Sequence, residues 1–255
     1  MFRFVPIGVV RSCFREKFGI PRQPGLVEAA RAALELLPPY NQPAAVRGLE
    51  GFSHLWLVFV FHGLPAGRWR PTVRPPRLGG NRRLGVFATR SGFRPNPIGL
   101  SAVKLEGIAT DRGRVVLHLA GVDVLDGTPV LDIKPYLPYV DRIPTATGGF
   151  ATEAPSSRLT VEFSPAAEAF CGTWPFDDLR ELITQILRQD PRPAYEQTDP
   201  APRRYGMKLY DRDVRWEMRG KMAYVTEILP AFTPAPTAGP LRPAGRRGSP
   251  RPADR

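Results

Sequence analysis

Short segments rich in apolar residues make up most of the first half of this chain. Phe4–Ser12 alternates toward the two-residue period of a strand, and the largely apolar His54–Phe61 suits a strand buried on both faces. Leu84–Arg90, Ser101–Ile108 and Arg114–Ala120 follow at short spacings. The pattern predicts a mainly β domain.

The segment Val27–Leu37 allows two structures. Its alanines favour a helix, whereas RAALELLPPY could be a strand that stops at Pro38-Pro39. Pro43–Leu49 is expected to form a short helix, and Asp111-Arg112-Gly113 a turn between two strands. The mainly β assignment stands under either structure of Val27–Leu37.

The pattern changes in the second half. Trp174–Gln189 predicts a helix with one apolar stripe, formed by Phe176, Leu179, Leu182, Ile183, Ile186 and Leu187. Gly206–Arg219 and Met222–Leu229 are expected to form a hairpin that turns at Gly220-Lys221. We therefore expect four regions: a main domain over residues 1–145, a linker over 146–157, a smaller α+β domain over 158–230 and a disordered Pro/Arg-rich tail over 231–255.

Charge adds a prediction about ligands. The formal net charge is +12, which predicts attraction to phosphates. Between Glu50 and Glu106 there is no acidic residue, but there are eight arginines and Lys104. A basic run is often only a solvated face, yet such a face usually carries compensating acids. This interval is therefore expected to bind an anion.

Other classes of protein fit the sequence poorly. No run of about 20 apolar residues predicts a membrane span. Cys13 and Cys171 lie far apart, and the three histidines lack metal-ligand spacing, so we expect no metal. The N-terminus does not resemble a signal peptide, so a reducing cytoplasm is expected. Without G-x-G-x-x-G or a P-loop, a doubly wound nucleotide-binding fold is disfavoured.

Arg94-Pro95-Asn96-Pro97 is a stiff segment with two polar side chains. The prolines restrict the backbone on both sides of Asn96. Such stiffness would hold Arg94 and Asn96 in one geometry, or it would simply connect rigidly into the next strand. Among the histidines, His54 sits within apolar residues and is expected to be structural, whereas His62 ends a strand beside a glycine, where ligands often bind.

Acidic residues return directly after the strand Arg114–Ala120. Asp123, Asp126 and Asp132 are the carboxylates that a β domain would bring near the arginine-rich interval. They could bind ribose hydroxyls, face a cationic ligand or accept a proton. Asp126-Gly127 also has the composition of an ordinary turn.

Four segments, taken together and in this order, resemble the TrmO (TsaA-like) family. They are IGVVRSCFREKFGIPRQPGLV, AVRGLEGFSHLWLVFVFH, RPPRLGGNRRLGVFATRSGFRPNPIGLS and VDVLDGTPVLDIKPYLPYVD, and they span about residues 5–145. QDPRPAY and DRDVRWEM resemble the second domain of the bacterial members.

The resemblance implies a fold, a cofactor and a reaction. The fold is a single-sheeted β-barrel, here with a smaller C-terminal α+β domain, in a homodimer that holds S-adenosylmethionine near the subunit interface. The reaction is methylation of N6 of threonylcarbamoyladenosine at position 37, in tRNAs that read ACN codons. The implied cofactor contacts are Pro24, Gly25, Leu26, His62, Gly63, Phe93, Arg94, Asp123, Val124, Leu125 and Asp126.

The reaction suggests roles for polar residues. The attacking nitrogen is urea-like and must lose its proton, so we take Asp126 as the first candidate for the base, although it could bind the cofactor instead. Asn96 and Arg90 would orient the carbamoyl group or the threonyl carboxylate. The expected tRNA contacts, by phosphate binding and by stacking, are Arg22, Arg82, Arg83, Lys134 and Tyr136.

Two other functions stay open on the sequence. The same barrel could hold tRNA or a small ligand without turnover, or it could methylate another modified base or a metabolite. Binding of S-adenosylmethionine distinguishes the first from an enzyme, and tRNA with and without the threonylcarbamoyl group distinguishes the second.

Overall fold

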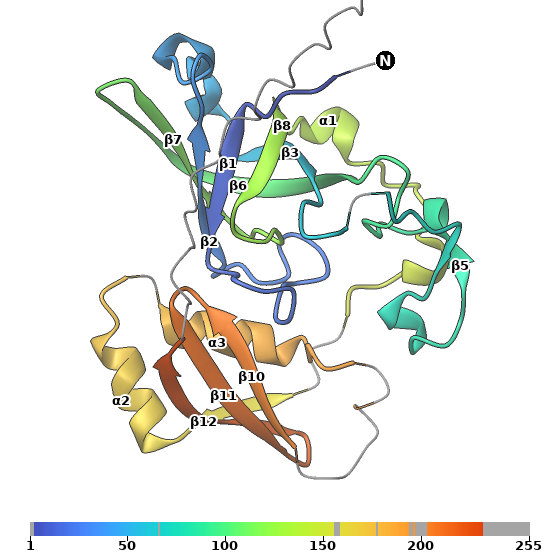
Figure 1. Cartoon of the computed structure of the whole chain (residues 1–255), viewed down its shortest axis with the longest axis vertical. Helices are drawn as coiled ribbons and strands as arrows, with labels where there is room; N and C mark the ends of the chain where they lie inside the picture. The colour runs from blue at the N-terminus through green and yellow to red at the C-terminus, as the bar shows by residue number, and fades with distance from the viewer. Residues whose placement is uncertain are drawn as a thin grey trace, which may run out of the picture.

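The computed structural model describes residues 3–65, 67–155, 159–176, 178–193, 196 and 203–231. Its first part is a closed barrel of antiparallel strands in the order β1-β2-β7-β6-β3-β8, drawn above the second part in Figure 1. The barrel strands are β1 (Gly8–Ser12), β2 (Arg31–Leu36), β3 (His54–Val60), β6 (Ile98–Asp111), β7 (Arg114–Ala120) and β8 (Thr128–Pro135).

The second part is a four-stranded sheet with two helices (Figure 1). Its strands run in the order β10-β11-β12-β9, and they are β9 (Thr160–Phe163), β10 (Arg204–Leu209), β11 (Arg212–Arg219) and β12 (Met222–Pro230). The helices are α2 (Pro165–Thr173) and α3 (Leu179–Arg188). The expected mainly β fold with a β-barrel and a smaller α+β part is confirmed.

The barrel forms because its strands alternate apolar and polar side chains, which places one set inside. In β2 and β3 every second residue is buried. Leu34, Leu55, Leu57 and Leu117 from three of the strands are fully buried. At about 25 cal/mol per Å² of apolar surface removed from water, such side chains dominate the stabilisation of the barrel.

Three connections between barrel strands meet at one end of the barrel, and they include the longest. β1, β3 and β7 end there, and β2, β6 and β8 begin there. The connections at this end are residues 13–30, 61–97 and 121–127. The 61–97 connection carries a small two-stranded sheet of β4 (Thr72–Val73) and β5 (Leu84–Gly85), which lies at the right of Figure 1.

The structure decides the uncertain segments of the first half. Val27–Leu37 contains the strand β2, because both of its edges pair, with β1 and with β7. Pro43–Leu49 contains a 3₁₀ helix over Pro43–Val46 and the start of another over Leu49–Gly51. The strand predicted for Leu84–Arg90 is wrong beyond β5: a 3₁₀ turn over Val86–Ala88 follows, and the Thr89 N–H closes it by bonding to the Val86 carbonyl at 3.1 Å.

Two predictions for the second half need correction. Phe176 does not belong to the apolar stripe: it precedes α3 and is 72% exposed, whereas the other five stripe residues are buried. Gly206–Arg219 is not one strand, since a turn at Tyr210 and Asp211 separates β10 from β11. The hairpin turn at Gly220-Lys221 is confirmed. Residues 232–255 of the predicted tail, and residues 156–157 of the predicted linker, lie outside the described residues.

The described residues lack two further features. No helix among them is long and apolar enough to cross a membrane. No group of three or more His, Cys, Asp or Glu side chains in the same residues could hold a metal ion.

Candidate cofactor and substrate site

A cleft of about 740 Å³ opens at the barrel end where the three connections meet. Residues from each of the three connections line it. They include Lys17 and Gln23 from the first, Phe61, His62, Arg90 and Arg94 from the second, and Asp123, Val124 and Leu125 from the third. This volume lies within the range of about 300–1,000 Å³ that is usual for small-molecule sites. The walls are largely apolar, with a few polar side chains facing inward.

Asp123 is the acidic residue of the cleft lining. Ser101, a buried residue of β6, donates its hydroxyl to Asp123 Oδ1 at 2.6 Å. Burial raises the pKa of Asp123 to about 6, against the opposing effects of the Ser101 hydrogen bond and the nearby Arg90 guanidinium. A carboxylate with this pKa can take up a proton near neutral pH.

The loop that carries Asp123 is held at its other end by β8. Thr128 donates its hydroxyl to the Leu125 carbonyl at 2.6 Å, and the same oxygen lies 3.4 Å from His62 Nδ1. His62 and Gly63 follow β3 directly, and both line the cleft. Lys17 Nζ donates to the Gly63 carbonyl at 2.5 Å, so the first and second connections touch across this end of the cleft.

Two arginines of the basic interval face the cleft. Arg90 donates to Gln23 Oε1 at 2.5 Å, which joins the second connection to the first. Arg94 donates to the Thr89 carbonyl at 2.7 Å and to the Val86 carbonyl at 3.2 Å, and so closes the 3₁₀ turn over Val86–Ala88. The remaining donors of both side chains are available to an anionic group in the cleft.

Half of the predicted site residues meet in this cleft. They are Arg22, His62, Gly63, Arg90, Phe93, Arg94, Asp123, Val124 and Leu125. The cleft lining does not include Pro24, Gly25, Leu26, Asn96, Asp126, Arg82, Arg83, Lys134 or Tyr136. Gly25 instead lines a second cleft of about 570 Å³, and its N–H bonds to the Gly121 carbonyl at 2.9 Å.

The predicted residues outside the lining have other contacts. Asn96 is exposed, and its carbonyl accepts the Ile98 N–H at 2.7 Å. Lys134 forms an ion pair with Asp132 at 3.0 Å. The Tyr136 ring lies 5.5 Å from that of Trp56, which lines the cleft.

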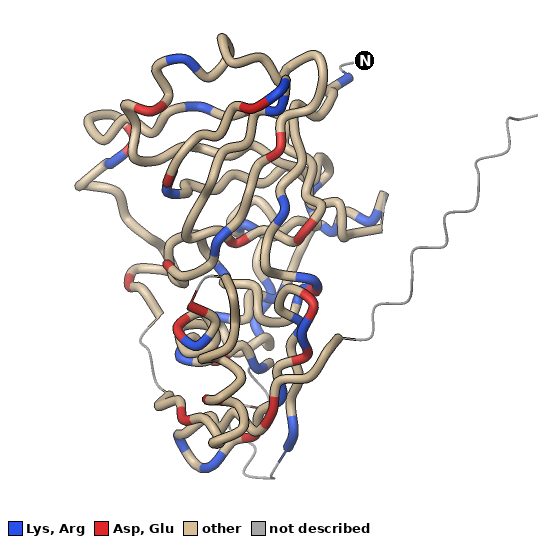
Figure 2. The backbone as a smooth tube through the Cα atoms, turned by 90° about the vertical axis from the view of Figure 1, so that its left-hand side faces the viewer, with Lys and Arg blue, Asp and Glu red and all other residues tan. Residues whose placement is uncertain are grey.

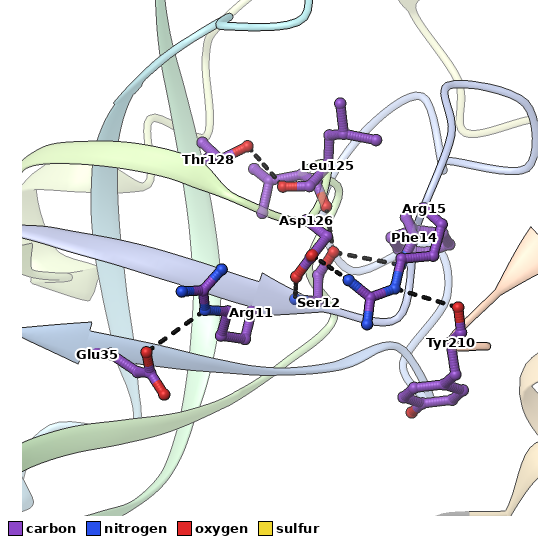
Figure 3. A network of polar contacts seen from close by, with 10 residues as sticks. Arg11, Ser12, Phe14, Arg15, Glu35, Leu125, Asp126, Thr128 and Tyr210 are labelled. Carbon is purple, nitrogen blue, oxygen red and sulfur yellow. Dashed lines mark hydrogen bonds and ion pairs between the residues drawn. The ribbon is translucent and has the colours of Figure 1, made fainter. Parts of the chain in front are cut away.

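The Asp126 carboxylate is bound on the side of the first connection. Its Oδ1 accepts the Ser12 N–H at 3.0 Å, and its Oδ2 forms an ion pair with Arg15 (Figure 3). The Asp126 N–H bonds to the Phe14 carbonyl at 2.9 Å. The geometry therefore places Asp123, and not Asp126, among the groups that line the cleft.

Sequence reasoning missed several lining residues. Lys17, Gln23, Ser101 and Thr128 gave no separate signal, although each lies within or directly beside a segment singled out for other residues. Their roles depend on contacts between connections that are far apart in the chain.

The arginines between Glu50 and Glu106 are not paired with acidic side chains within the described residues. Figure 2, which views the molecule from the left of Figure 1, shows basic and acidic positions interspersed over barrel and C-terminal sheet. Among the described residues, none of the eight arginines between Glu50 and Glu106 forms an ion pair with an acidic side chain. The positive charge of these arginines is therefore not neutralised by ion pairs and can attract an anionic ligand.

Comparison with known proteins matches both parts of the chain. The family model of the tRNA-methyltransferase O N-terminal domain matches residues 9–142, and that of the TrmO C-terminal domain matches residues 156–231. An Escherichia coli protein named tRNA (adenine(37)-N6)-methyltransferase is 51% identical over 219 residues, which cover 85% of this chain and 93% of that protein.

Two further matches come from Pseudomonas aeruginosa. A protein whose name describes an S-adenosylmethionine-dependent methyltransferase is 55% identical over 214 residues, covering 83% of this chain and 90% of that protein. A crystal structure of TrmO matches with a TM-score of 0.74 at 45% identity, covering 89% of this chain and 98% of the other. These matches confirm the resemblance that the four sequence segments indicate.

Proposed function

The chain belongs to the tRNA-methyltransferase O family, and on that premise we propose that it methylates N6 of threonylcarbamoyladenosine at position 37 of tRNA. It is an S-adenosylmethionine-dependent tRNA (adenine-N6)-methyltransferase. The observation that carries the finer proposal is the cleft in which one buried carboxylate, Asp123, faces Arg90 and Arg94. A methyl acceptor with a carboxylate and an acidic N–H suits this set of groups.

The cleft fits the cofactor in size and in chemistry. Its volume of about 740 Å³ and its apolar walls suit a nucleoside with a side chain. We propose that the cofactor is held by His62, Gly63, Phe93, Arg94 and the 123–126 loop. The Pro24–Leu26 turn is proposed to contact it as well. When bound, S-adenosylmethionine supplies an electrophilic methyl group on a positively charged sulfur.

For the proton that the attacking nitrogen loses, Asp123 is the better candidate base. It lines the cleft, and its pKa of about 6 suits a base that works near neutral pH. Asp126, which the sequence suggested first, has both carboxylate oxygens engaged by Ser12 and Arg15. Arg90 would orient the threonyl carboxylate of the substrate, because a guanidinium binds a carboxylate with two parallel hydrogen bonds.

A methyl-transfer assay on two forms of one tRNA tests the substrate. The tRNA reads an ACN codon and either carries or lacks the threonylcarbamoyl group. We expect transfer to the modified form and at least a hundredfold less to the unmodified form, since a site built for a carboxylate is left with unpaired buried groups without it. Equal transfer to both would contradict the proposal, and calorimetry showing no S-adenosylmethionine binding would favour a binding protein instead.

The exposed arginines of the basic interval are proposed to bind tRNA phosphates. Arg82 and Arg83 are both exposed, and Arg83 donates to the Thr72 hydroxyl at 3.1 Å. Replacing both by Ala should weaken tRNA binding for all sequences and reduce the slope of log K against log salt by about 1–2. The measurement is a fluorescence titration at several salt concentrations.

The control for this prediction is Arg112→Ala. Arg112 is equally exposed, but it lies on the β6–β7 turn, on the side of the molecule away from β5 (Figure 1). It should leave the salt slope unchanged. If the control and the double variant shift the slope equally, the charge acts non-specifically and the proposed tRNA face is wrong.

A homodimer is proposed to form through the outer face of β3 and β6. The outward positions next to the cleft are apolar: they are Val58, Val60, Ile98 and Leu100, of which Leu100 is 53% exposed. Next to them, α1 (Pro138–Asp141) and the residue Ile143 add exposed apolar side chains. An apolar face of this kind on a folded domain commonly marks a protein interface. Because Ile98 and Leu100 also line the cleft, the interface would border the cofactor.

Leu100→Asp should convert the dimer to a monomer, because a charge would be buried without a partner. Light scattering after size-exclusion chromatography gives the mass. Leu37→Asp is the matched control: Leu37 is also exposed, but it follows β2, which lies opposite β3 in the closed barrel. A Leu100→Asp protein that stays dimeric would rule out this interface.

As a tRNA-modifying enzyme, the protein is proposed to act in the cytoplasm.

A further inference from the structure

The first connection of the barrel joins the C-terminal sheet as an additional edge. Phe14 and Leu209 form an antiparallel bridge, and the Tyr210 N–H bonds to the Cys13 carbonyl at 2.7 Å. The Arg15 N–H bonds to the Lys208 carbonyl at 3.3 Å. Phe14 and Leu209 are fully buried, so this edge is a packed contact between the two parts of the molecule.

Side chains extend this edge to the third connection. Arg15 donates through Nε to the Tyr210 carbonyl at 3.1 Å, and through Nη1 it forms an ion pair with Asp126 (Figure 3). Asp126 in turn accepts the Ser12 N–H at the end of β1. The C-terminal sheet, the first connection and the third connection therefore meet at two side chains, which we call the Arg15–Asp126 bridge.

The cleft lies on the other side of the same two connections. Lys17 follows Arg15 by two residues and touches Gly63 across the cleft. Leu125 precedes Asp126 directly and also lines the cleft. Lys17 and Leu125 both lie against Gly63, so a shift of the first connection relative to the third would change this part of the cofactor site. The Arg15–Asp126 bridge is a side-chain contact between these two connections, and through Arg15 it also joins the C-terminal sheet.

We propose that Arg15 and Asp126 are positioning residues, through which the docked C-terminal domain sets the width of the cofactor cleft. The proposal rests on the proposed function, because it takes this cleft to bind S-adenosylmethionine. The exposure of the pair supports a role in geometry: the side chains are 48% and 16% exposed, and an ion pair so near the surface adds little to stability. Its main effect is to restrict the distance between two chain segments.

Arg15→Met and Asp126→Asn test the proposal in the full chain. Met keeps most of the apolar stem of Arg15, and Asn keeps an oxygen for the Ser12 N–H. Each variant should raise the Kd and the KM for S-adenosylmethionine about fivefold, which is the most that an ion pair worth about 1 kcal/mol can transmit to the site. The kcat at saturating cofactor and the KM for tRNA should change less than about threefold. Arg15→Lys should recover part of the lost affinity, and the double variant should be no worse than either single variant.

The matched control is Arg11→Met. Arg11 is 56% exposed and pairs with Glu35 across two barrel strands, away from the cleft and from the C-terminal sheet (Figure 3). This variant should bind the cofactor like the wild type. Circular dichroism and thermal melting verify that each variant is folded, and Arg15→Lys keeps the test valid if Arg15→Met does not fold.

Three outcomes would overturn the proposal. Variants that bind the cofactor as tightly as Arg11→Met would show that the bridge does not position the cleft. A fall in kcat at saturating cofactor for Asp126→Asn alone, with Kd unchanged, would make Asp126 a catalytic base. Strictly additive losses in the double variant would mean that the two side chains act separately. If the wild type itself binds no S-adenosylmethionine, the proposed function fails first.

Discussion

Replacing Asp123 by Asn should lower the kcat for tRNA methylation by a factor of about 100 or more, as the loss of a general base does. Asn keeps the size of the side chain and can still accept the Ser101 hydroxyl, which now bonds to Asp123 Oδ1 at 2.6 Å. It cannot take a proton from the attacking nitrogen. Single-turnover kinetics at saturating S-adenosylmethionine separate this effect from weaker cofactor binding.

The pH dependence of the wild type supplies a second readout of the same role. Burial raises the pKa of Asp123 to about 6. The kcat/KM of the wild type should therefore rise with pH through about 6 and then level off, because only the ionised carboxylate accepts a proton. In Asp123→Asn this rise should be absent.

The same substitution should stabilise the protein at pH 8. The folded-state pKa of Asp123 is raised to about 6 from an ordinary value of 3.8, so protonation favours the folded state. The stability that this proton provides is present at acid pH and is lost as the pH rises through about 6. Asn resembles the protonated acid. The free energy of unfolding of the variant should therefore exceed that of the wild type by about 1–2 kcal/mol at pH 8.

Asp132→Asn serves as the control for both effects. Asp132 is an aspartate of β8 that pairs with Lys134 and does not line the cleft. Its substitution should change neither kcat nor the pH profile. An Asp123→Asn enzyme that retains the wild-type kcat and its rise with pH would exclude Asp123 as the base.

Replacing Gly99 by Ala should destabilise the fold by about 1–3 kcal/mol, as overpacking of a core does. Gly99 faces Phe59 directly across β6 and β3, and the Phe59 ring covers the glycine. An added Cβ would lie 2.3 Å from Cζ of the buried ring, far inside ordinary contact distance. The ring cannot yield easily, because it also packs edge-to-face on Phe61 at 5.2 Å.

This substitution should also weaken cofactor binding. Gly99, Phe59 and Phe61 all line the cleft, so a displaced ring would intrude on it. Denaturant unfolding and calorimetry measure the two effects. The matched control is Gly107→Ala in the same strand, where an added Cβ would meet no atom within 4 Å. Because the change from Gly to Ala reduces the entropy of the unfolded chain, the control should be neutral or slightly stabilising. An equal stability loss at both positions would show that the Phe59 ring is not the cause.

The sequence was informative wherever local pattern decides structure. The apolar runs located β1, β3, β6 and β7, and the turn at Gly220-Lys221 followed from its residue types. The apolar periodicity did not predict the structure of segments in which pairing with neighbouring strands determines whether a strand forms. Val27–Leu37 forms a strand because β1 and β7 pair with it, and in Leu84–Arg90 the strand is short because β4, which pairs with it, has two residues.

For the site, the order of motifs along the chain was enough to identify the family and therefore the chemistry. Residue types also predicted that acids after β7 and arginines of the 61–97 connection belong to one site, and Asp123, Arg90 and Arg94 do line one cleft. Sequence could not choose between Asp123 and Asp126. Both are aspartates of one short loop, and they differ only in what surrounds them.

That choice needed the folded chain, because a carboxylate acquires its properties from its contacts. Ser101 and burial set the pKa of Asp123, while Ser12 and Arg15 engage Asp126, and none of these neighbours is near in sequence. The Arg15–Asp126 bridge to the C-terminal sheet is equally hidden in the sequence, since Arg15 and Tyr210 lie 195 residues apart. Local pattern therefore specified the strands and the family, and long-range packing specified which side chain does what.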